Sequence, residues 1–408
     1  MCDCVVALGP ATASGVALFG KNSDRERDEA QPVRSFSRAD HPAGRRIRCT
    51  HIEIPQVRET ASVLGTGPFW CWGLEQGGNE HGVVVGNETV FTHEELELPE
   101  QGLLGMDLVR LALERARTAR GAVEIIADLI ERFGQGGPGW LHMQLGYSNG
   151  FLIADPDEAW TLQTSSRRWA AARIEELGSI SNQLSIGTDW EIGSEDLERY
   201  AIERGWWSEE QGPLHFEQAY RSTRLFSAAG SEGRLRRSTD LLTRDRGKLG
   251  EADLFRLLRD HGGQAVPPVA EKTEEAYFTL CAHNEVQQDT TASLVAAPAR
   301  RTRWLALGAP CSSVYLPLFL DAKVPKALTQ GGEKPEDGSA WWTFKRLQQQ
   351  VEADFRSRLP RVRDAFDPLE AEWLRWDDEA SDGGARMEEA SARALETCRR
   401  LLEELGGA

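Results

Sequence analysis

The order of strand-like and helix-like segments constrains this chain more than any other feature of its sequence. Short apolar runs of strand length come first, and residues 105–133 then carry apolar side chains at helical spacing. Strand-like runs return at 150–186 and again at 292–297 and 304–307, with helical segments between and after them. Because strands and helices gather in separate groups, the sequence predicts an α+β fold in which helices are segregated around antiparallel sheets.

A hairpin is predicted at the N-terminus. Asp3–Leu8 is a short apolar run that ends at Gly9-Pro10, and a second apolar run, Val16–Phe19, follows. The polar segment 20–25 (GKNSDR) is expected to form a loop after the second strand. Folding of the hairpin would bring this loop beside the N-terminus.

The length of 408 residues exceeds the usual size of a single domain. We expect a main domain at 1–335 and a C-terminal helical segment at 336–408 that packs on it, because no long flexible linker separates the two. Within this segment the pattern predicts helices at 341–366 and 370–405, broken near Pro360, Pro368 and Gly383-Gly384.

The charge balance argues against some classes of partner. With 64 acidic and 47 basic residues the net charge is −17, which disfavours nucleic acids and anionic membranes as partners. No apolar run approaches the roughly 18 residues of a membrane span. No basic segment followed by an apolar run begins the chain, so a signal peptide is not expected and the predicted location is cytoplasmic.

The chain has seven cysteines, at positions 2, 4, 49, 71, 281, 311 and 398, without the spacing of a disulfide framework. In a reducing compartment they are expected to be free thiols. Cys2 and Cys4 are too close for the usual zinc half-site, and no other pair has a partner pair at zinc-site spacing. No metal site is therefore expected, and His283 is interpreted as a structural histidine.

Cys2 is special because of its position. If Met1 is removed, Cys2 carries both a nucleophilic thiol and an α-amine with a pKa of roughly 7.7–8.0, which suits a general base near neutral pH. The alternative is an inert terminal residue. Cys4 shares the strand face of Cys2, because residues i and i+2 point the same way, and it is interpreted as a buried strand cysteine.

Two charged residues of segment 20–25 are candidates for the same site. Lys21 is the only lysine in residues 1–247, in a chain with 7 lysines and 40 arginines. A lysine at position 21 of such an arginine-rich chain predicts a functional cation beside Cys2. This cation would lower the pKa of the Cys2 thiol. Asp24 could orient the amine of Cys2, pair with a cation, or be an ordinary turn aspartate.

Several short motifs occur in an order that resembles one family. They are MCDCVVAL (1–8), GKNSDR (20–25), WCWG (70–73), NEHGVVVGNE (79–88), LGMDLVRL (104–111), DEAW (157–160), SNQL (181–184) and GWW (205–207). Together they resemble the secernin group of the C69 dipeptidases. These belong to the N-terminal-nucleophile (Ntn) hydrolases, in the branch with choloylglycine hydrolases and penicillin V acylases. The resemblance covers most of residues 1–320.

The resemblance implies a four-layer αββα sandwich with the nucleophile at the start of a central strand. Cys2 matches the nucleophile, and Asp24 matches the aspartate that holds its amine. Lys21 takes the position where the bile-salt hydrolase branch has an arginine. Secernins often have threonine where this chain has Cys4, so the resemblance leaves open which of the two thiols reacts.

Three further residues receive roles from the resemblance. Asn182 matches an asparagine of the oxyanion hole, where an amide N–H stabilises the negative charge that develops on the substrate oxygen. Asn87 is a second polar candidate, and Arg221 is a looser match to an arginine that closes the site. The simpler alternatives are residues at strand ends for Asn182 and Asn87, and a surface helix arginine for Arg221.

The predicted function is a cysteine-type Ntn hydrolase that cleaves amide bonds of dipeptides or short peptides. Two alternatives stay open: a non-peptide amidase such as an N-acyl amide hydrolase, and a secernin-like interaction protein without catalysis, since a fold does not guarantee activity. No cofactor is expected. The expected partner is a small peptide or amide substrate, and association into a homo-oligomer is left open.

Overall fold

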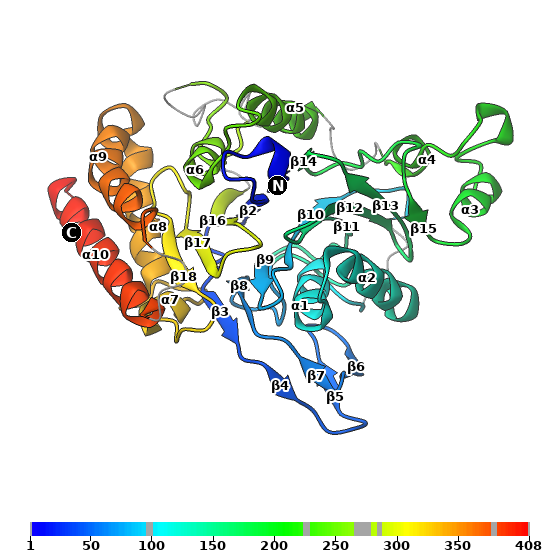
Figure 1. Ribbon diagram of the computed structural model, residues 1–408, viewed down its shortest axis with the longest axis horizontal. Helices are drawn as coiled ribbons and strands as arrows, with labels where there is room; N and C mark the ends of the chain where they lie inside the picture. The colour runs from blue at the N-terminus through cyan, green and yellow to red at the C-terminus, as the bar shows by residue number, and fades with distance from the viewer. Residues whose placement is uncertain are drawn as a thin grey trace.

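Two antiparallel sheets lie face to face between helices in the computed structural model, which describes residues 2–94, 101–222, 229–264, 279–283, 288–376 and 382–406 (Figure 1). The first sheet has the order β14-β1-β2-β16-β17-β18. Its strands are β1 (Cys2–Ala7), β2 (Leu18–Arg25), β14 (Leu177–Ile180), β16 (Asp289–Ala296), β17 (Thr302–Leu307) and β18 (Leu316–Phe319).

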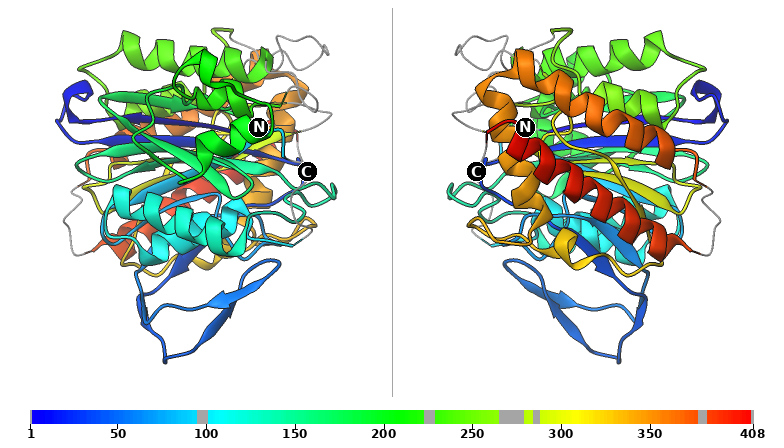
Figure 2. Two further views of the ribbon diagram at one scale, coloured as in Figure 1. Left: turned by 90° about the vertical axis from the view of Figure 1, so that its right-hand side faces the viewer. Right: turned by 90° about the vertical axis from the view of Figure 1, so that its left-hand side faces the viewer.

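The second sheet has the order β15-β13-β12-β11-β10-β9-β8-β3. Its strands are β3 (Val33–Phe36), β8 (Val63–Thr66), β9 (Gln76–Asn79), β10 (Val84–Val90), β11 (Ser148–Ala154), β12 (Ala159–Ser165), β13 (Arg168–Ile174) and β15 (Ile192–Gly193). An arm of two small strand pairs extends from this sheet (Figures 1 and 2), and it is formed by β4 (Ala39–Asp40), β5 (Arg46–Arg48), β6 (Glu53–Pro55) and β7 (Glu59–Thr60).

Helices cover the outer face of each sheet. The helices α1 (Gly105–Arg115) and α2 (Ala119–Phe133) pack on the second sheet. On the first sheet lie α5 (Ala229–Arg244), α6 (Glu251–Leu258), α8 (Ala340–Ala353) and α10 (Gly383–Glu404), with α9 (Phe355–Trp373) against α8 and α10. Shorter helices are α3 (Leu197–Glu203), α4 (Phe216–Tyr220) and α7 (Lys326–Thr329), with 3-10 turns at Gly9–Ala11 and Glu209–Gln211. The predicted α+β class with αββα layers is therefore confirmed.

Local sequence explains where α2 begins and ends. The side chain of Thr118 accepts a hydrogen bond from the Gly121 nitrogen and caps the first turn, and Gly134, with φ of 74°, ends the last. Between these ends Val123, Ile126 and Ile130 are buried against the second sheet, as their helical spacing predicts.

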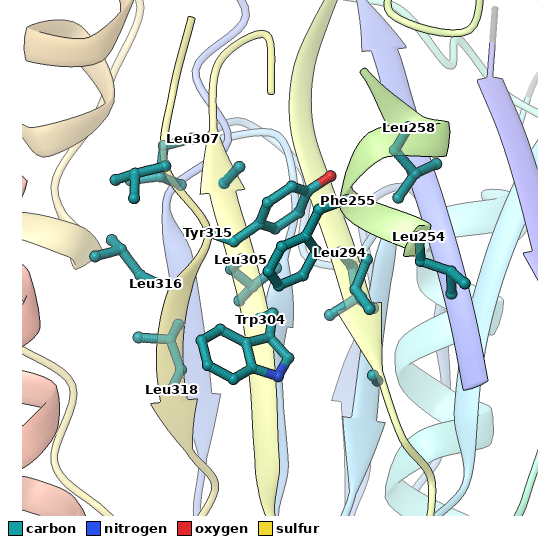
Figure 3. Close-up of a cluster of buried hydrophobic side chains, with 14 of the residues drawn as sticks. Leu254, Phe255, Leu258, Leu294, Trp304, Leu305, Leu307, Tyr315, Leu316 and Leu318 are labelled. Carbon is teal, nitrogen blue, oxygen red and sulfur yellow. The ribbon is translucent and has the colours of Figure 1, made fainter. Parts of the chain in front are cut away.

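Aromatic packing joins the helical layer to the first sheet. Phe255 of α6 stacks on Tyr315, with ring centroids 4.1 Å apart, and meets Trp304 of β17 edge to face (Figure 3). Such pairs add to the burial of apolar area in holding two layers together. This core fixes α6 above β2 and β16, the strands that carry part of the candidate site.

The predicted loop at 20–25 is wrong, because β2 continues through Arg25. Polar side chains are tolerated there because distant groups satisfy them. The amide nitrogen of Asn22 donates to the carbonyl oxygens of Leu258 and Leu280, each at 2.8 Å. β2 also pairs its backbone with β1 on one side and β16 on the other, with one register shift between Thr290 and Ala292 of β16.

The C-terminal segment forms α8, α9 and α10, and α10 lies across β18 and α8 (Figure 2). The predicted helix breaks at Pro360 and Pro368 are wrong, since α9 runs through both. The chain turns instead at Asp354, whose φ is −159° and whose carboxylate caps α9 by accepting from the Ser357 nitrogen. Among the described helices, none is long and apolar enough to cross a membrane.

Candidate active site

The pairing of β1 with β2 places the predicted site residues side by side. Cys2 pairs with Ser23, and Cys4 pairs with Lys21. The side chains of Cys4 and Lys21 point toward the second sheet, where Gly86 of β10 has no side chain of its own. A β-carbon at Gly86 would lie 2.5 Å from Lys21 Cδ and 3.0 Å from Cys4 Sγ. The close approach of the sheets at this point therefore needs glycine.

Gly86→Ala is expected to destabilise the protein by about 1–3 kcal/mol, because the new methyl group forces Lys21 and its neighbours to move. Urea denaturation of both proteins measures the difference in the free energy of unfolding. Gly332→Ala is the matched control, since a β-carbon there meets nothing within 4 Å. Equal stability of the two variants would contradict this account of the sheet contact.

The backbone nitrogen and the sulfur of Cys2 are both held by hydrogen bonds. Its nitrogen donates to Asn182 Oδ1 at 2.7 Å, and its sulfur accepts a hydrogen bond from the Asp24 nitrogen at 3.4 Å. Burial raises the pKa of the Cys2 thiol to about 11, and the positive charge of Lys21 opposes that rise. A thiolate at this position therefore depends on the nearby cation and on the backbone N–H of Asp24.

Lys21 is fully buried and held by acceptors from the second sheet. Its Nζ lies 3.3 Å from Glu75 Oε2 and donates to the backbone oxygen of Asn87. Arg25 also pairs with Glu75, at 3.3 Å through Nη1. Burial lowers the pKa of Lys21, but the negative charges of Cys2 and Glu75 outweigh it and raise this pKa well above its usual value. Lys21 therefore keeps its proton near neutral pH.

Asp24 carries its carboxyl group into a buried environment. Thr290 donates to Asp24 Oδ1 at 2.6 Å. Burial raises the pKa of Asp24 to about 6, and the Thr290 hydrogen bond opposes the rise. Since a raised carboxyl pKa means that the proton is retained up to that pH, Asp24 is neutral well below pH 6 and anionic above it. Near neutral pH it can thus stabilise a cationic amine.

Asn182 and Asn87 differ in the hydrogen bonds that their side chains make. Asn182 presents its oxygen to Cys2, and its amide nitrogen donates to the Thr89 oxygen at 2.9 Å. Asn87 lies with its side-chain amide between Asn149, at 3.2 Å, and Glu75. As the structure stands, Asn182 orients the Cys2 nitrogen with its oxygen, and Thr89 takes one of the two N–H donors of its amide.

Arg221 and Arg234 have opposite surroundings. Arg221 has an exposed fraction of 33% at its side chain and pairs with Glu217 and Glu232. It has no contact with Cys2 in the part of the chain that the structure describes. Arg234 is 2% exposed and donates to Asn182 Oδ1 at 2.6 Å, as well as to Asp3 and Ser181. Sequence reasoning missed Arg234, because one arginine among 40 carries no signal.

A second cluster of chemically active side chains lies apart from these contacts. His261, Cys281, His283 and Cys311 are all buried, and each offers a ligand atom within 4.8 Å of the others. Burial raises the pKa of Cys311, but a hydrogen bond with Cys281 and the charge of His283 hold it well below its usual value. Their spacing along the chain gave no sign that these four side chains meet.

One comparison with known proteins finds a family match in the central part of the chain. Residues 48–229 match the model of Peptidase family C69. The matched region contains Glu75, Asn87 and Asn182, whereas Cys2, Lys21 and Asp24 precede it. The match supports a hydrolase that acts on amide bonds.

Solved structures also resemble the chain at low identity. The C2A variant of conjugated bile acid hydrolase from Clostridium perfringens has 13% identity and a TM-score of 0.45, covering 75% of this chain and 89% of its own. Penicillin V acylase from Agrobacterium tumefaciens has 10% identity and a TM-score of 0.45, with 78% and 86% covered. An N-acylethanolamine-hydrolyzing acid amidase ortholog from Caenorhabditis elegans has 11% identity and a TM-score of 0.38, with 72% and 92% covered.

Proposed function

We propose that this chain is a cysteine-type Ntn hydrolase that cleaves amide bonds of dipeptides or short peptides after removal of Met1. The observation that carries the proposal is the double anchoring of Cys2. Its nitrogen lies 2.7 Å from Asn182 Oδ1 and its sulfur 3.4 Å from the Asp24 nitrogen. A nucleophile and a base on one residue are thereby held in a fixed relation.

The reaction uses the two functional groups of Cys2 in turn. The α-amine takes the thiol proton while the sulfur attacks the carbonyl carbon of the substrate. The ammonium group then protonates the leaving nitrogen, the amide bond breaks, and a thioester remains. Water, deprotonated by the same amine, attacks the thioester and releases the acid and the thiol.

The surrounding residues support each stage of this sequence. Asn182 Oδ1 accepts the backbone N–H of Cys2. After removal of Met1 the same contact would hold one N–H of the amine and leave its lone pair available for the thiol proton. Asp24 stabilises the ammonium form, and Lys21 favours the thiolate. Asn87 and Asn182 remain the predicted donors to the oxyanion.

Cys4 is the less suitable nucleophile. Its side chain has no exposed surface, and Lys21 faces it from the paired position of β2. Burial raises the pKa of the Cys4 thiol well above its usual value, and the neighbouring carboxyl group of Glu88 raises it further. Exposure of its own α-amine would also require loss of two residues from β1, which pairs with strands on both sides.

The test uses purified full-length protein whose N-terminal residue is established by mass spectrometry. Rapid quenching during turnover of a library of dipeptides and N-acyl amides should yield a burst of product and an acyl group on Cys2. Preference for N-acyl amides in direct competition would favour the non-peptide amidase. A protein with free Cys2 that forms no acyl-enzyme with any member would contradict catalysis and favour the interaction protein.

A further inference from the structure

Four side chains from three separate segments of the chain meet in the part of the molecule formed by the first sheet and the helices that cover it. His261 follows α6, Cys281 and His283 lie in the segment 279–283, and Cys311 follows β17. His283 Nε2 is 3.4 Å from Cys281 Sγ and 3.1 Å from Cys311 Sγ. His261 is 6% exposed and Cys311 2% exposed. Two sulfur and two nitrogen donors thus lie within 4.8 Å of one another.

His283 is oriented for ligation. His283 Nδ1 lies 3.0 Å from Glu352 Oε1, which leaves Nε2 directed at the two sulfurs. Glu352 is itself fixed by Gln348, whose amide donates to the same oxygen at 2.7 Å. A carboxylate on the far nitrogen of a histidine is the usual outer support of a metal ligand. His261 Nε2 is buried and has no hydrogen-bond partner among the described residues.

We propose that His261, Cys281, His283 and Cys311 bind a zinc ion in a closed, four-coordinate site. Two thiolates and two imidazoles are a donor set that zinc accepts in tetrahedral geometry, with all positions filled by protein. Thiolate ligands disfavour magnesium and calcium, which prefer oxygen. A closed site of this kind stabilises structure and leaves no position for substrate.

The site would fix a segment that reaches the candidate active site. The Cys281 nitrogen donates to the Asp260 oxygen at 3.1 Å, and Ala282 exchanges hydrogen bonds with Thr290. Thr290 in turn donates to Asp24 Oδ1 at 2.6 Å. Zinc would therefore join α6, segment 279–283 and the turn after β17, and would hold the support of Asp24 in place.

A cavity gives access to this cluster. It has a volume of about 410 Å³, and His261 and Cys311 lie on its wall with Arg259 and Arg363. A metal ion could thus enter from the side of α6 and α9 without separation of the two sheets. The proposal stands on the four donors and does not depend on the chemistry of Cys2.

The test is the metal content of the full-length protein purified without a metal-affinity tag. Elemental analysis should find about one equivalent of zinc per chain, and incubation with a strong chelator should lower the Tm by about 5 °C or more. Replacement of zinc by cobalt should give the thiolate-to-cobalt charge-transfer band and the intense visible bands of tetrahedral coordination.

Variants distinguish this site from other uses of the same thiols. Cys281→Ser and Cys311→Ser should each lose at least about 90% of the bound zinc, whereas Cys398→Ser, which replaces a buried thiol of α10, should keep it. If a variant does not fold, native wild type decides: a mercurial reagent binds thiolates more tightly than zinc does, so its titration should release about one equivalent of zinc, measured with a chromogenic chelator. Wild type that takes up no zinc and no cobalt, or that holds a Cys281–Cys311 disulfide, would overturn the proposal.

Discussion

Cys2→Ala is expected to lower kcat/KM for amide hydrolysis by roughly 10⁴–10⁶, the loss seen when a covalent nucleophile is removed. The variant retains the α-amine and its contact with Asn182, so the general base is left without a thiol to activate. Cys2 is 5% exposed at the start of β1, so loss of its sulfur should cost some stability. Removal of one atom from a site at the end of a strand should cost far less than the effect on activity. Steady-state rates and urea denaturation of the same preparations measure both effects.

Cys4→Ala is the matched control, since it removes a second buried thiol from the same face of β1. It should retain activity within about tenfold of wild type, because the sulfur of Cys4 takes no part in the proposed reaction. The opposite pattern, an active Cys2→Ala and an inactive Cys4→Ala, would assign the nucleophile to Cys4.

The N-terminal hairpin was predictable because its apolar runs are local in the sequence. Cys2, Lys21 and Asp24 could be proposed together for the same reason, since a hairpin brings neighbouring segments side by side. The continuation of β2 through its polar half was missed. Its side chains are satisfied by groups more than 200 residues away, such as the Leu258 and Leu280 oxygens that accept from Asn22.

Other residues of the site could not be predicted from sequence patterns, because only the tertiary fold brings them to the site. Arg234 lies on a helix in a chain with 40 arginines, and Glu75 is one of 64 acidic residues, yet both are buried beside the candidate site. The four-donor cluster has the same origin. Its four residues lie between His261 and Cys311 at intervals that match no zinc motif. Their spacing in the sequence therefore could not predict that the fold brings them together.

Lys21→Met should lower kcat/KM by roughly 10²–10³, because the thiolate and the developing negative charge lose a buried cation. Without Lys21 the pKa of Cys2 rises further, since burial disfavours the thiolate and no charge opposes it. The rise of activity with pH should therefore move to higher pH in the variant. A pH profile of kcat/KM measures this shift directly.

Lys345→Met is the control that separates the predicted effect of Lys21→Met on catalysis from a loss of stability. Lys345 is the other buried lysine of the described chain that pairs with an acid, with its Nζ 2.7 Å from Asp289 Oδ2. Removing either cation from its acid should cost less than the ~3–5 kcal/mol of an isolated buried pair, because Glu75 keeps Arg25 and Asp289 keeps Arg27. Only Lys21→Met should alter the pH profile. If both variants lose activity in proportion to stability and keep the wild-type pH profile of kcat/KM, Lys21 contributes only to the stability of the fold. The compact ammonium group next to Cys2 would then be required only by the packing against Gly86.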